Sequence, residues 1–127
     1  MAGRRPMMAA VRIEPLAALL VLFAGPAAAQ PAPSFEVACA DLRGALAKLG
    51  QPDEITTIAV KGKLIAVRSD GALVYLFLCD PPAPRVLCVT YEANDSKEGD
   101  EVIVTGNLIP RGPDHVQLDP CLHDPVE

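Results

Sequence analysis

The apolar positions of residues 34–49 follow a helical period. They recur in steps of three and four residues, which places side chains on one stripe of an α-helix. Ser34 suits the N-cap of such a helix, and Gly50 followed by Pro52 suits its end. The pattern predicts a helix over residues 34–49 that must dock its stripe on the rest of the chain. The stripe consists of Phe35, Cys39, Leu42, Leu46 and Leu49.

From Ile55 onward the pattern becomes that of extended strands. Gly62 lies inside the first strand, and a glycine there often marks a bulge or a sharp bend. The polar, acidic stretch 92–100 reads as a solvated loop. Strands follow one another without intervening helices, which favours a mainly β, five-stranded barrel with an N-terminal helix. The predicted strands cover residues 55–68, 73–79, 85–91, 101–107 and 116–118.

The second predicted strand, "LVYLFLC", is apolar on both of its faces. Tyr75 and Phe77 point to one side, whereas Leu76 and Leu78 point to the other. One side belongs to the barrel interior. The other side must be covered by the helix, by a partner or by a ligand.

The first 29 residues have the organisation of a secretory signal peptide. A basic start is followed by an apolar run over residues 16–23 and by an Ala-x-Ala site, so cleavage is expected after Ala29. The run is far shorter than the roughly 20 residues of a membrane span, which argues against an anchor. We therefore expect a periplasmic or secreted protein. Its predicted parts are a leader (1–29), a flexible lead-in (30–33), one domain (34–122) and a tail (123–127).

Charge changes when the leader is removed. The whole chain has 11 basic and 16 acidic residues; without Arg4, Arg5, Arg12 and Glu14 it has 8 and 15, a net charge near −7. An acidic domain repels phosphate backbones, so nucleic acid is an unfavourable partner. The same charge opposes docking on anionic lipid.

All four cysteines lie in the mature part, and none forms a Cys-x-x-Cys motif. An even number of cysteines in a small exported chain favours two disulfides, and three pairings are open. The alternative is a metal site in which Cys121, His123 and Asp124 join Cys79 or Cys88 around zinc. We expect disulfides and no cofactor.

The order of the predicted elements resembles a known family. A helix over Ser34 to Leu49, the bent strand "VKGKLIAV", a hairpin, "GDEVIVTGNL" and a terminal "VQLDPCL" are similar to small exported bacterial OB-fold proteins of the tRNA-anti-like type. Two features depart from that family: the acidic loop replaces a helix, and aromatic stacking residues are sparse. The resemblance therefore implies the scaffold and not nucleic-acid binding. Most of these relatives lack an assigned activity.

The resemblance also bears on the cysteine pairing, because the third and fifth strands of an OB barrel are neighbours. It favours Cys88–Cys121, which leaves Cys39–Cys79 to tie the helix to the second strand. The competing pairing is Cys39–Cys121 with Cys79–Cys88, since the prolines at 81–84 keep Cys79 near the third strand.

These observations predict an exported, non-enzymatic binding module whose partner is an unknown protein or saccharide. The candidate binding residues are Tyr75, Phe77, Arg85 and Tyr91. The alternatives are a periplasmic metal-binding protein and, less favoured, a small hydrolase. For the hydrolase, Asp114 and His115 hint at a catalytic pair, but no nucleophile accompanies them, and His115 is better read as a turn residue.

Overall fold

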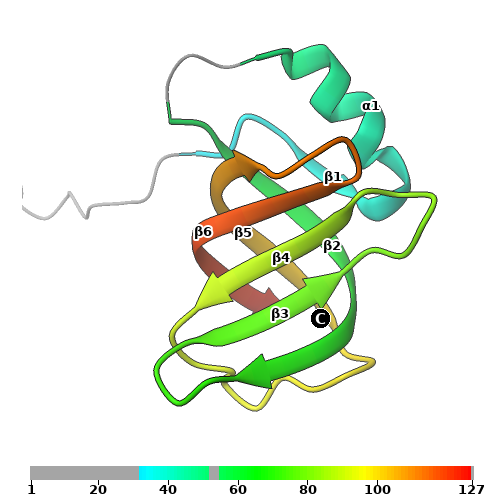
Figure 1. The fold of residues 1–127 in the computed structure, drawn as a ribbon. Helices are drawn as coiled ribbons and strands as arrows, with labels where there is room; N and C mark the ends of the chain where they lie inside the picture. The colour runs from blue at the N-terminus through cyan, green and yellow to red at the C-terminus, as the bar shows by residue number, and fades with distance from the viewer. Residues whose placement is uncertain (1–31, 52–54, 127) are drawn as a thin grey trace, which may run out of the picture. The chain divides into compact units, whose positions relative to one another are not determined.

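The computed structural model describes residues 32–51 and 55–126. The predicted leader, 1–29, lies outside the described residues, as do the first two residues of the lead-in. Residues 32–51 and 55–126 form a barrel with one helix (Figure 1). Its elements are β1 (Glu36–Ala38), α1 (Cys39–Leu49), β2 (Thr57–Ser69), β3 (Val74–Leu78), β4 (Arg85–Thr90), β5 (Glu101–Pro110) and β6 (His115–Pro125).

Five strands close the barrel in the order β2-β3-β4-β6-β5, and β5 pairs back with β2. The β4–β6 contact is parallel, and the other four contacts are antiparallel. The fifth barrel strand thus lies beside the third. A closed, mixed, five-stranded barrel with this order fits an OB-fold and confirms the predicted fold class.

The predicted helix over 34–49 is too long at its start. Residues 36–38 form β1, which pairs in parallel with Ala59–Lys61 of β2. The backbone N–H of Ser34 donates to Thr57, so Ser34 does not cap the helix. The physical reason is an open edge, because β3 covers only residues 64–69 of β2. The helix begins at Cys39 and ends at Leu49, and the following Gly50 caps it by donating its N–H to the carbonyl of Leu46.

The long strand β2 pairs with two neighbours in the barrel. Its first half pairs with β5 and its second half with β3. The bulge lies between Leu64 and Ala66 rather than at Gly62. A side chain on Gly62 would place its Cβ 2.6 Å from the Sγ atom of Cys39, so this glycine makes room for a disulfide.

The last strand is much longer than the predicted 116–118, and it includes most of the predicted tail. Pro120 does end the pairing with β4, which stops at Leu118. It does not end the pairing with β5, which runs on to Pro125. Asp119 and Pro120 lie opposite the single residue Asn107, and such a bulge needs no ladder N–H from proline.

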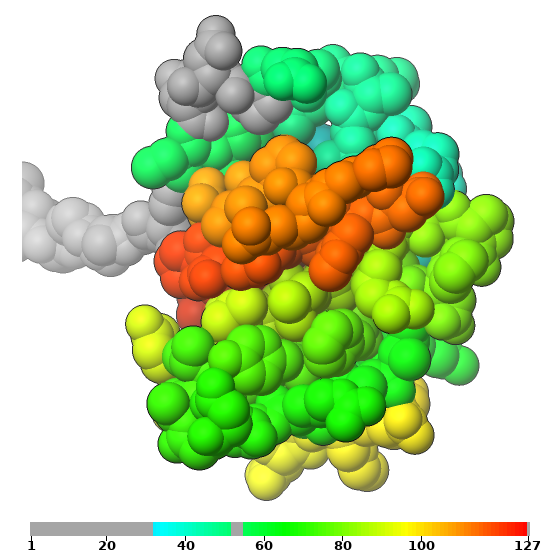
Figure 2. All heavy atoms as spheres, viewed as in Figure 1, coloured from blue at the N-terminus to red at the C-terminus, as the bar shows by residue number. Residues whose placement is uncertain are grey.

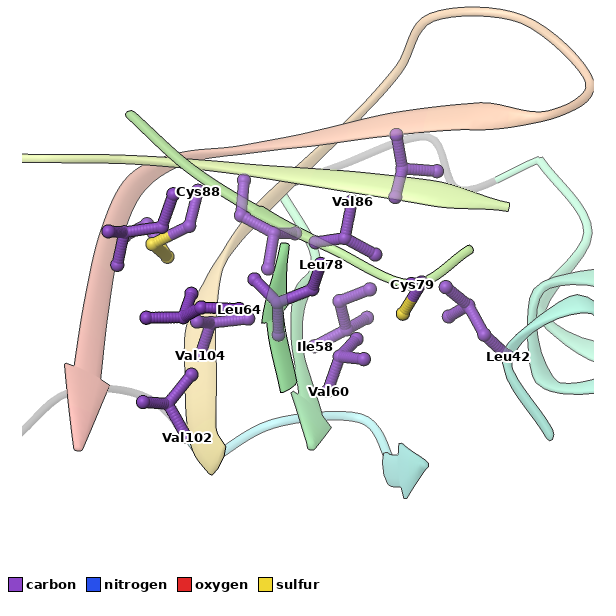
Figure 3. Close-up of a cluster of buried hydrophobic side chains, with 14 of the residues drawn as sticks. Leu42, Ile58, Val60, Leu64, Leu78, Cys79, Val86, Cys88, Val102 and Val104 are labelled. Carbon is purple, nitrogen blue, oxygen red and sulfur yellow. A yellow bond between two sulfur atoms is a disulfide. The ribbon is translucent and has the colours of Figure 1, made fainter. Parts of the chain in front are cut away.

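The barrel interior is filled by aliphatic side chains from all five barrel strands (Figure 3). Every second residue of β3 points inward, at Val74, Leu76 and Leu78, and all three are buried. Leu42 is the buried residue of α1, and it lies beside Cys79 at the helix end of the core. The helix thus closes one end of the barrel.

Two disulfides hold these parts together. Cys39–Cys79 joins the first residue of α1 to the residue after β3, with its Cα atoms 5.4 Å apart. Cys88–Cys121 joins β4 to β6 at a Cα separation of 5.5 Å. This is the pairing that the resemblance favours, and it leaves none of the described cysteines free. Disulfides of this kind suggest an oxidising, extracellular-type environment.

Replacing Gly106 by alanine is expected to lower the free energy of unfolding by about 2 kcal/mol. A Cβ on Gly106 would overlap the carbonyl oxygen of Pro120, in the β6 bulge, and lie 3.0 Å from the Cα of Cys121, the residue that follows the bulge; both are backbone atoms. Gly44→Ala is the matched control, because a Cβ there has nothing within 4 Å and alanine favours a helix. Urea unfolding should show G106A less stable and G44A slightly more stable than the parent. Equal stability of G106A and the parent would contradict this packing.

Candidate functional site

The outer face of β3 and β4 carries apolar side chains that the barrel does not need for its core. Phe77 is paired with Leu87 of β4 and with Ala66 of β2, and all three are half-buried on the outside. Figure 2 shows this side of the molecule, with the surfaces of β3, β4 and β6 next to one another. The outer face of β3, for which the sequence predicts a cover, is therefore partly open to solvent.

Tyr75 lies on the same face, one pleat away from Phe77, and its hydroxyl is already occupied. It donates to Oδ2 of Asp70 at 2.7 Å, while Oδ1 of Asp70 accepts the backbone N–H groups of Leu73 and Ala72. The bond from Leu73, then those from Tyr75 and Ala72, lower the pKa of Asp70 from 3.8 to about 2. The bond to Asp70 raises the pKa of Tyr75.

These hydrogen bonds fix the β2–β3 hairpin and the orientation of Tyr75. Because the pKa of Asp70 is depressed in the folded state, the stabilisation is fully present above pH 4 or so and is lost as the pH falls through about 2. Tyr75 is thus a fixed aromatic edge of the face at neutral pH.

A hollow of about 520 Å³ lies at the end of this face where β4 begins. It lies between the β3–β4 loop and the β5–β6 loop, and Phe77 forms part of its wall. Two of the four predicted binding residues, Phe77 and Arg85, meet here. Its other side chains include Arg43, Asp114 and His115, together with the loop residues 81–83.

Arg43 of α1 holds the two loops that border this hollow. Its guanidinium donates to the carbonyl of Pro82 at 2.7 Å, to that of Pro113 at 3.3 Å and to Oδ1 of Asp114 at 2.8 Å. Sequence reasoning missed this residue. The available signal was its position one helical turn after Cys39, which places both on the face of α1 that meets the loops.

The other predicted residues are placed differently. Tyr91 follows the last residue of β4, at the opposite end from Arg85, and is 74% exposed outside the hollow. His115 is the first residue of β6 rather than a turn residue. Asp114 pairs with Arg43, and among the described residues no hydrogen bond joins it to His115. The suspected catalytic pair is not assembled.

The residues of the predicted zinc alternative are engaged elsewhere. Cys79, Cys88 and Cys121 are in disulfides and so offer no thiolate. His123 is a buried residue of β6, not a tail residue; its Nε2 donates to the carbonyl of Glu92 at 2.8 Å, and its Nδ1 lies 3.5 Å from Oγ of Ser96. His123 therefore fastens the acidic loop to the barrel. In the part of the chain that the structure describes, no metal-binding cluster forms.

A larger hollow of about 670 Å³ lies between residues 34–37 and α1. Its apolar lining includes Phe35 and Leu49, and its charged residues, Asp41 and Lys48, are of opposite sign. None of the predicted binding residues reaches it.

Over residues 32–51 and 55–126, no helix is long and apolar enough to cross a membrane.

Comparison with known proteins adds little to this description. No family model matches the chain, and no curated protein matches it. Among solved structures, a chain of the S. pombe Stn1–Ten1 complex is similar, with a TM-score of 0.41 and 14% identity over 57% of this chain and 67% of that chain. A similarity of this size carries no argument about function. The assignment of the fold rests on the closed strand order of the barrel.

Proposed function

We propose that this protein is an exported, non-enzymatic binding module that presents the outer face of β3 and β4 to a protein or saccharide partner. The leader ending at Ala29 supports export, and the two disulfides agree with an oxidising destination. The resemblance of the sequence to small exported bacterial proteins of the tRNA-anti-like OB type also supports an exported module.

One observation carries the proposal: the barrel has a filled interior and still holds apolar side chains outside. Leu76 and Leu78 are buried inside, whereas Phe77 between them is half-exposed outside and pairs with the equally outward Leu87. An apolar surface at a rimmed hollow is typical of a binding surface. The face of the second and third barrel strands is also the one that OB-folds use for ligands.

We propose a binding function and not an enzymatic one, because the described residues bring no nucleophile and base together near this face. Nucleic acid is disfavoured by charge, because the whole chain carries a formal net charge of −5. A protein or saccharide partner needs neither a catalytic pair nor a broad basic surface.

Position-specific photocrosslinking tests the proposed surface. A photoreactive phenylalanine analogue placed at position 77 of the full chain, expressed in its native host, is expected to give a discrete adduct with a partner from the exported compartment. The matched control is the same analogue at Leu122, which is apolar and 51% exposed on the second half of β6. An adduct at 77 and none at 122 is the expected result.

Two outcomes would contradict the proposal. Equal crosslinking from both positions would mean that the adducts come from non-specific hydrophobic contacts and not from this face. No adduct at position 77, with the protein exported and folded, would mean that the face has no partner.

A further inference from the structure

The hollow beside Phe77 contains a cation, Arg85, that none of the described residues neutralises. Arg43 also lines the hollow, but its guanidinium already donates to two carbonyls and is paired with the carboxylate of Asp114. Asp114 is in turn paired with Arg43. The Arg85 side chain is exposed, and within the described residues its guanidinium makes no hydrogen bond or ion pair. The hollow thus offers one free guanidinium within an acidic protein.

A second polar group in the same hollow lacks a partner. The ring of His115 lines the hollow, and its Nε2 is buried without any hydrogen bond in the described structure. A buried nitrogen of this kind calls for a partner from outside the chain, such as water, an ion or a ligand group. His115 is paired with Arg85 in the β4–β6 register, so the two side chains are neighbours.

The walls of the hollow are preformed. Arg43 ties the β3–β4 loop to the β5–β6 loop, and the N–H of Arg85 donates to the carbonyl of Asp114 at 2.9 Å. Pro81 and Pro82 stiffen one rim. A preformed site loses little entropy when a ligand binds, which favours a small, specific ligand.

We propose that this hollow binds a carboxylated sugar, such as a uronic acid residue of a saccharide. The carboxylate lies on the free guanidinium of Arg85, which matches its planar geometry. The apolar face of the sugar ring packs on Phe77. This inference rests on the proposed function and specifies the ligand class of the same surface.

The topology disfavours an acidic peptide at this position. Peptides often bind sheets by adding a strand at an open edge. Here β3 is paired with both β2 and β4, and β4 is paired with both β3 and β6, so this face offers no open edge. A polyanion would also face the net charge of the whole protein, whereas a single carboxylate needs only the local cation.

Isothermal titration of the purified mature protein with digalacturonic acid tests the proposal. The expected result is saturable binding that weakens as salt is added and disappears when the carboxylates are methyl-esterified. Arg85→Gln is expected to weaken binding by about tenfold or more. Arg68→Gln is the matched control, because Arg68 is also exposed on the same outer face but lies outside the hollow, and it should change the affinity by less than about twofold.

Several results would overturn the proposal. Equal binding of the methyl ester and the acid would exclude a carboxylated sugar in this hollow. So would equal weakening of binding by R68Q and R85Q, or preferential binding of a glutamate-rich peptide over the sugar. Absence of uronate binding by folded protein would exclude it too. If the crosslink at position 77 still formed in that case, the proposed surface would stand and only its ligand class would fail.

Discussion

Replacing Cys88 and Cys121 together by alanine is expected to lower the free energy of unfolding by about 4 kcal/mol. The disulfide closes a loop with a sequence separation of 33 residues, and loss of that constraint frees the unfolded chain. Both residues are also buried in the core, so their removal leaves a small cavity. Urea unfolding of the oxidised parent and of the double variant measures the difference.

A double alanine variant of Cys39 and Cys79 is the control for this prediction. Its loop is of similar length, with a separation of 40 residues, but this disulfide fastens α1 rather than two barrel strands. It should therefore lose the helical signal in circular dichroism at a lower denaturant concentration than the strand signal. If the Cys88/Cys121 variant lost less than about 1 kcal/mol, closure of the barrel would not depend on this link.

Leu76→Ala is expected to lower the free energy of unfolding by about 3 kcal/mol. Leu76 is buried at the middle of β3 and points into the barrel, where its removal would leave a cavity that the closed sheet cannot collapse. Thermal and denaturant unfolding with matched buffers provides the measurement.

Phe77→Ala is the matched control for Leu76, because it removes a larger side chain from the next position of the same strand. Phe77 points outward and is half-buried, so its loss should cost less than half as much as that of Leu76. A larger loss from Phe77 than from Leu76 would mean that the two faces of β3 are assigned the wrong way round.

The barrel itself could be predicted because its signals are local. The extended apolar run of β3 and the glycine at position 50, after the last residue of α1, are visible in the sequence, and each records one local requirement. The disulfide pairing could not be predicted from local signals, because it depends on which strands are neighbours in the barrel. The resemblance to the OB-fold supplied that neighbourhood, and the register between β4 and β6 agrees with it.

The remaining features could not be predicted because their causes are distant in the sequence. Residues 36–38 become a strand only because β3 leaves one edge of β2 open. Pro120 is compatible with β6 only because a bulge opposite Asn107 removes the need for its N–H, and the side chain of Asn107 donates to the carbonyl of Asp119 at 3.3 Å. No local sequence pattern predicts the open edge of β2 or the bulge opposite Asn107.

In the candidate site, too, some residues could be predicted from the sequence and others could not. Phe77 and Arg85 are two of the four binding residues predicted from the sequence, and the structure brings them to one hollow. Arg43 and His115 reach the hollow from α1 and β6, which are distant in sequence. Tyr91 looked equivalent to Phe77 in the sequence, but β4 carries it to the opposite end.

Peptide mapping of the non-reduced protein by mass spectrometry tests the barrel most directly, because Cys88 can reach Cys121 only if β4 and β6 are neighbours. The predicted result is two linked peptide pairs, Cys39 with Cys79 and Cys88 with Cys121, and no free thiol. A link between Cys79 and Cys88, or any unpaired cysteine in the exported protein, would contradict the account.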